Sequence, residues 1–128
     1  MSLHRSNAPF AEKCPIRDVL DRMGDRWSML VLLMLQEGGT LRFSALKSRI
    51  EDISQRMLAQ TLRRLEQDGL VSRTVFPTSP PRVDYALTAL GASFMQPMAS
   101  LVEWADAHHE EVRAARKAYV PPTAIEAR

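Results

Sequence analysis

The chain has 128 residues, 45% of them hydrophobic and 25% charged, which is the composition of one ordinary globular domain. The net charge of +2 does not by itself indicate a nucleic-acid partner, and the one cysteine excludes an internal disulfide. No apolar stretch reaches the roughly 18 residues of a membrane span, and no signal-peptide core is seen, so we expect a cytoplasmic protein without a membrane partner.

Polar, aperiodic segments flank the predicted domain. Residues 1–13 are expected to form a loose arm, and residues 113–128 are expected to form a tail. Between them, residues 14–112 carry the periodic apolar patterns of one folded domain without internal repeats.

Three helices are predicted in the first half of this domain. Pro15 suits the first turn of a helix that Gly24 closes. A second helix begins near Asp25 and ends at Gly38, and because it is apolar on nearly every side we expect it to be the central buried helix. After a short β-compatible step, residues 43–50 have the spacing of a third helix.

The most informative stretch is a fourth predicted helix at residues 54–67, with Ser54 as its N-cap and Gly69 after its end. At about 100° per residue, one arc is apolar and comprises Met57, Leu58, Thr61, Leu62 and Leu65. The opposite arc is mostly polar and comprises Gln55, Arg56, Ala59, Gln60, Arg63 and Gln67, with Arg64 on its border. The first arc predicts a buried face. Arg and Gln side chains of the second can read base edges and bind phosphates, although an ordinary solvated helix also has such a face.

The third and fourth predicted helices are joined by only a few residues. Two helices so connected, the second with a polar face, predict a helix-turn-helix. The charge distribution agrees, because residues 42–64 hold six basic side chains against two acidic ones.

The apolar period changes to two after the fourth helix. Residues 71–76 and 82–87 alternate as strands do, and the proline-rich residues 77–81 form a turn between them. A hairpin directly after a helix-turn-helix is a wing, here spanning residues 71–87. Arg73 is interpreted as a structural residue of its first strand.

A long last helix is predicted after Thr88, its N-cap, with a kink at Pro97 and an end that fades past His109. One side carries an apolar stripe that so small a domain cannot cover alone. We therefore expect a homodimer interface there. Its predicted residues are Leu90, Phe94, Met98, Leu101, Val102, Trp104 and Ala105.

Several motifs together resemble a known family. They occur in order over about 90 residues and are Cys14-Pro15, Gly24-Asp25-Arg26-Trp27, Leu41-Arg42-Phe43, Ile53-Ser54-Gln55-Arg56-Met57-Leu58, Leu62-Arg63-Arg64-Leu65-Glu66-Gln67-Asp68-Gly69-Leu70-Val71, Pro80-Pro81-Arg82-Val83-Asp84-Tyr85, Leu87-Thr88-Ala89-Leu90-Gly91 and Trp104. The chain resembles the HxlR-type family of bacterial winged helix-turn-helix regulators, which is similar in fold to the MarR group. Asp25 and Asp84 are small departures from the family pattern.

The resemblance implies a mainly helical α+β fold with a small hairpin and a long dimerisation helix. It also implies a homodimeric transcription factor that binds a pseudo-palindromic operator in double-stranded DNA, with repression as the favoured outcome and an effector of unknown kind. The alternative is a winged-helix module for protein–protein assembly whose DNA face is silent. No enzyme signature is present, and neither a cofactor nor a metal is expected.

The expected DNA contacts fall into three groups. Near the start of the recognition helix, base or nearby backbone contacts are expected from Ser54, Gln55, Arg56 and Gln60. Further along, Arg63 and Arg64 are expected to hold phosphates, with a structural ion pair as the alternative for Arg64. The third group comprises Arg82, expected in the minor groove or else solvated, and Arg42 with Ser44, for which phosphate contact and plain helix capping are equally open.

Four other residues have weaker claims to function. Cys14 is interpreted as a packing or capping residue, although family resemblance allows a redox sensor, which as the sole cysteine could form only an intermolecular disulfide or a mixed adduct. Trp27 is expected to pack in the core or an interface. His108 and His109 lack a third ligand at metal-site spacing and are expected to be solvated.

Overall fold

The computed structural model describes residues 14–123, so the arm predicted for residues 1–13 lies outside it. The chain divides into two compact units, one ending at Met95 and one beginning at Gln96. The first unit contains the predicted helix-turn-helix and wing. No helix among the described residues is both long and apolar enough to cross a membrane.

Four helices of the first unit match the predicted ones in place and order: α2 (Pro15–Met23), α3 (Arg26–Gly38), α4 (Phe43–Arg49) and α5 (Gln55–Gln67). Local chemistry explains their ends. The Asp25 carboxylate accepts a bond from the Ser28 backbone N–H at the start of α3, and the Ser54 hydroxyl accepts one from the Met57 N–H at the start of α5. Gly39 and Gly69 follow α3 and α5 with positive φ values of 74° and 78°, a conformation that glycine adopts without strain.

The core of the first unit forms where α3 and α5 pack together. On α3, Val31, Leu32 and Leu35 are buried, whereas Trp27 and Leu30 are only half-buried. The expectation that α3 is buried on nearly every side is therefore wrong for the described chain. The helix presents one fully buried face and keeps a second apolar face partly open.

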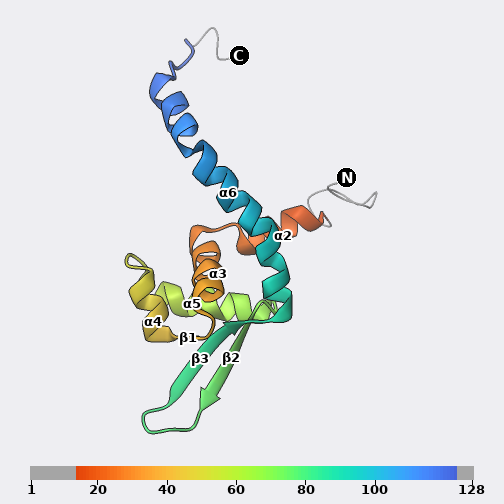
Figure 1. Cartoon of the computed structure of the whole chain (residues 1–128), viewed down its shortest axis with the longest axis vertical. Coiled ribbons are helices and arrows are strands. Elements are labelled where there is room, and N and C mark those ends of the chain that lie inside the picture. The colour runs from red at the N-terminus through yellow and green to blue at the C-terminus, as the bar shows by residue number, and fades with distance from the viewer. Residues whose placement is uncertain (1–13, 124–128) are drawn as a thin grey trace. The chain divides into compact units, whose positions relative to one another are not determined.

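The sheet has three strands in the order β1-β3-β2, all antiparallel. The predicted hairpin is confirmed as β2 (Val71–Phe76) and β3 (Arg82–Leu87), and it projects from the helices in Figure 1. The third strand, β1 (Leu41–Arg42), pairs with the outer side of β3, with Arg42 opposite Asp84. The wing is thus anchored to the segment that immediately precedes α4.

The last helix, α6 (Ala89–Ala118), starts in the first unit and continues through the second. Its predicted N-cap is confirmed, since the Thr88 hydroxyl accepts a bond from the Gly91 N–H at 3.0 Å. The predicted fading past His109 is wrong. The segment after it is rich in Ala, Arg and Lys, which favour helix, and Arg116 and Lys117 in the last turn suit the negative end of the helix dipole.

Candidate nucleic-acid interface

Helix α5 separates its apolar and polar residues as the sequence predicts. Leu58, Thr61, Leu62 and Leu65 are buried, and Met57 is half-buried. The side chains on the opposite side are exposed, namely Gln55, Arg56, Gln60, Arg63 and Gln67. The buried face holds α5 in the fold, so its polar face is available to a partner.

The polar face of α5 continues onto the sheet. One shallow hollow is lined by Arg56, Ala59, Gln60 and Arg63, and a neighbouring one by Ala59, Arg63, Glu66, Arg73 and Tyr85. The two hollows share Ala59 and Arg63, so they form one continuous surface. We call this surface, from Gln55 to Arg73, the reading surface.

Arg73 is a residue whose position sequence reasoning interpreted wrongly. It was expected to be structural, but beyond Val71 every residue of β2 is exposed. Arg73 makes no ion pair or side-chain hydrogen bond with any residue in the described range 14–123. It therefore adds an uncompensated positive charge to the reading surface, next to Arg63.

Arg82 on the wing is held by a buried acid. The Arg82 Nε and Nη2 atoms donate to the two Asp84 carboxylate oxygens at 3.0 and 2.8 Å, and Asp84 is only 7% exposed. These hydrogen bonds, and then the positive charges of Arg82 and Arg42, lower the pKa of Asp84 despite its burial. The Arg82 guanidinium also lies 5.0 Å from the centre of the Phe76 ring. Its geometry is thus set in advance while part of its side chain stays exposed.

A second hollow, of about 600 Å³, lies between the start of α4 and the wing. It brings together three of the expected contact residues, Arg42, Ser44 and Arg82. Arg42 occupies the N-cap position of α4 but makes no side-chain capping bond. Its guanidinium is consequently not used in the way that the capping alternative requires.

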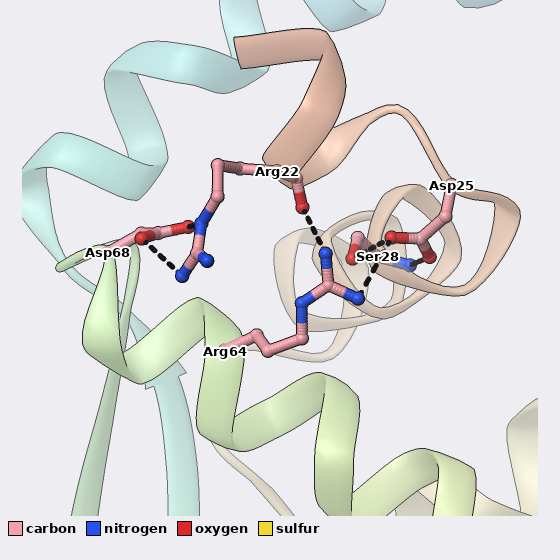
Figure 2. Close-up of polar contacts among 5 residues, drawn as sticks. All are labelled: Arg22, Asp25, Ser28, Arg64 and Asp68. Carbon is pink, nitrogen blue, oxygen red and sulfur yellow. Dashed lines mark hydrogen bonds and ion pairs between the residues drawn. The ribbon is translucent and has the colours of Figure 1, made fainter. Parts of the chain in front are cut away.

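Arg64 points away from the reading surface (Figure 2). Its Nη2 atom donates to the Arg22 carbonyl oxygen at 3.2 Å, and its Nη1 atom lies 3.9 Å from the Asp25 carboxylate. This arrangement corresponds to the structural ion pair that was one of the two alternatives for Arg64. Ser54 likewise has a local role, because its hydroxyl caps α5.

The predicted stripe of α6 is divided by its surroundings. In the first unit Leu90 is 57% exposed and Phe94 is half-buried, while Met95, which the predicted stripe omitted, is buried. In the second unit Leu101, Trp104 and Ala105 are exposed, Val102 is half-buried and Met98 is buried.

The remaining candidates lie at helix ends or on the surface. Cys14 is buried at the N-cap position of α2. The His108 ring stacks on Trp104, with ring centres 4.8 Å apart, which is a contact within one helix. Among the described residues no three His, Cys, Asp or Glu side chains converge as a metal site would require.

A helix-turn-helix followed by a wing on a three-stranded sheet defines a winged helix-turn-helix protein. A model of the HxlR-like helix-turn-helix family matches residues 22–113. The chain is 46% identical over 107 residues to the uncharacterised HTH-type transcriptional regulator YtfH of Escherichia coli (strain K12), a match that covers 84% of each protein. The chain belongs to the HxlR-like helix-turn-helix family.

Solved structures give the same assignment. The ytfH protein from Salmonella typhimurium is 42% identical, with a TM-score of 0.75 over 88% of this chain and 99% of that one. The reduced form of the transcriptional regulator YodB from B. subtilis is 36% identical, with a TM-score of 0.64 over 73% of this chain and 91% of that one. The chain is therefore a helix-turn-helix transcriptional regulator.

Proposed function

We propose that the protein acts as a homodimer that binds a pseudo-palindromic site in double-stranded DNA and represses transcription. The observation that carries this proposal is the reading surface, which combines exposed Arg and Gln side chains on a helix whose other face is buried. In a winged helix-turn-helix the second helix of the motif enters the major groove, and its first residues meet the base edges. That place falls to Gln55, Arg56 and Gln60.

Phosphate contacts flank this base-reading region. Arg63 and Arg73 lie at one side of the reading surface, and Arg42 with Ser44 lines the hollow beside the wing. Arg82, preset by Asp84, faces the same hollow and is proposed to reach the minor groove or its phosphates. Such charges supply affinity and register, while the bases supply sequence preference.

Dimerisation follows from apolar side chains left exposed on α6. Leu101 and Trp104 are each more than half exposed, at 54% and 53%. At about 100° per residue they fall within roughly 60° of one another. A two-fold axis would set two recognition helices about 34–36 Å apart and so require inverted half-sites. We favour repression because a bound dimer that covers its DNA excludes other proteins without any further contact.

The test begins with selection of duplexes from a random library by the purified wild-type chain. An inverted repeat, bound as two chains with an affinity that falls steeply with salt, is the expected result. A reporter carrying the selected site should then be silenced by the protein. If no sequence is enriched and no salt-dependent binding occurs, the protein-assembly alternative replaces this proposal.

Arg56→Ala tests the assignment of the recognition helix. We expect it to weaken binding of the selected duplex by about 1–3 kcal/mol and to relax the preference at a subset of base pairs, since Arg56 lies exposed in the first turn of α5. The matched control is Arg49→Ala, an exposed arginine at the end of α4 outside the reading surface. Unaltered affinity and base preference in Arg56→Ala would remove this residue from the base contacts.

A further inference from the structure

The C-terminal end of α5 is tied to α2 by a bidentate ion pair (Figure 2). Arg22, in the last turn of α2, donates from Nε and Nη2 to the two carboxylate oxygens of Asp68 at 3.1 and 2.9 Å. Asp68 is the C-cap residue of α5. The hydrogen bonds and charge of Asp68 raise the pKa of Arg22, so the pair is fully charged at any physiological pH. Two parallel bonds of this kind fix direction as well as distance.

A second arginine runs in the opposite direction. Arg64, on α5, donates to the carbonyl oxygen of Arg22 and approaches the Asp25 carboxylate. Asp25 is itself fixed, because it accepts bonds from the backbone N–H and the hydroxyl of Ser28 at 2.8 and 2.9 Å. The last turn of α5 is consequently joined both to the end of α2 and to the start of α3.

The first turn of α6 adds a third tie. The Thr88 hydroxyl donates to the carbonyl oxygen of Gly69, directly after α5, at 2.6 Å. By contrast, the N-terminal half of α5 presents Gln55, Arg56 and Gln60 to solvent. The recognition helix is thus anchored by polar bonds at one end and presents its base-reading residues at the other.

Small errors at the anchored end grow along the helix. From Asp68 to Gln55 the helix is about 20 Å long at ~1.5 Å per residue, so a tilt of about 5° moves its far end by about 1.7 Å. Hydrogen bonds to bases span only about 2.7–3.2 Å, and a shift of that size breaks them. Apolar packing alone is non-directional and sets this angle less sharply.

We propose that Arg64 and Asp68 are positioning residues, which set the orientation of α5 for base reading and do not contact DNA themselves. The inference rests on the proposed DNA-binding function and divides the neighbouring Arg63 and Arg64 into a phosphate contact and an anchor. Their exposure agrees with this division, because Arg63 lies on the reading surface and Arg64 is only part-exposed and bonded inward.

The experiment compares Arg64→Gln and Asp68→Ala with Arg63→Gln as the matched control. Each full-length variant is titrated against the duplex selected by the wild type and against a scrambled duplex of equal length, at several salt concentrations. Thermal melting identifies a temperature at which every variant is folded, and Arg22→Gln breaks the same ion pair from α2 should Asp68→Ala fail to fold.

We expect Arg64→Gln and Asp68→Ala to weaken the selected duplex by about three- to tenfold, with the scrambled duplex little affected and the salt slope unchanged. Arg63→Gln should instead weaken both duplexes and lower the salt slope by about one. The sign for Asp68→Ala is decisive. Loss of a negative charge by itself favours DNA, whereas loss of an anchor opposes specific binding.

Three results would overturn the inference. They are a reduced salt slope in Arg64→Gln, unchanged or tighter specific binding in Asp68→Ala, and a loss in either variant that is equal on both duplexes. A role in folding alone would lower the melting temperature and the active fraction but keep the ratio of the two affinities. Absence of selective DNA binding by the wild type would refute the proposed function as a whole, which is a distinguishable outcome.

Discussion

The proposed dimer can be tested most directly at Leu101, where we expect Leu101→Asp to separate the two chains. Full burial of a leucine stabilises by about 1.5–3 kcal/mol. Because Leu101 is 54% exposed in the single chain, roughly half of this, ~0.8–1.6 kcal/mol, is available to a partner. A two-fold axis uses the residue twice, which gives ~1.6–3.2 kcal/mol per dimer, or about 15- to 200-fold in the dissociation constant. The figure is a lower bound, since aspartate also brings a charge into the interface.

Sedimentation equilibrium over nanomolar to micromolar concentrations measures this change. Ala107→Asp is the matched control, because it adds the same charge at an exposed position on another side of α6. We expect the control to remain dimeric and to bind the selected duplex, and Leu101→Asp to be monomeric and to lose operator binding although it touches no DNA. A wild type that is monomeric at micromolar concentration and binds its site as one copy would refute the reasoning.

Three further predictions concern the interface and its regulation. Arg73→Gln should weaken all duplexes alike and lower the salt slope by about one, and a titration with an unchanged slope would return Arg73 to a structural role. Because Arg82 lowers the pKa of Asp84, the pair stabilises the fold above the ordinary carboxyl pKa of about 4 and loses this effect as the pH falls through the lowered value; Asp84→Asn should flatten that acid limb in urea melts at graded pH. Cys14→Ser should retain basal DNA binding, and an identical peroxide response in wild type and variant would exclude a sensor role.

Much of α5 was predictable because its pattern is strong. Five core-facing residues at helical spacing, a capping serine and a following glycine each indicate the same helix with the same orientation. Arg64 was ambiguous for a physical reason. A residue on the border between the two arcs can turn either way, and only its tertiary neighbours Arg22 and Asp25 decide which.

The wing shows where alternation stops being informative. Period two tells which residues share a face but not whether anything covers that face, and beyond Val71 all of β2 is exposed. Arg73 was therefore misinterpreted. The signal for Asp84 was present, because it lies two residues after Arg82 on the same face of the strand. Its burial could not be inferred, since it depends on β1, a strand of only two residues.

The division of α5 into an anchored end and a presenting end has a consequence for how such a regulator can change its target. Substitutions at positions 55, 56 and 60 alter exposed side chains, and surface changes of this kind usually shift stability by no more than about 0.5 kcal/mol. The ties at Arg64 and Asp68 lie one to two turns further along and are left intact. Operator preference and structural integrity are therefore encoded in separate parts of one 13-residue helix. A new target sequence can be acquired, or grafted by design, without rebuilding the fold that presents it.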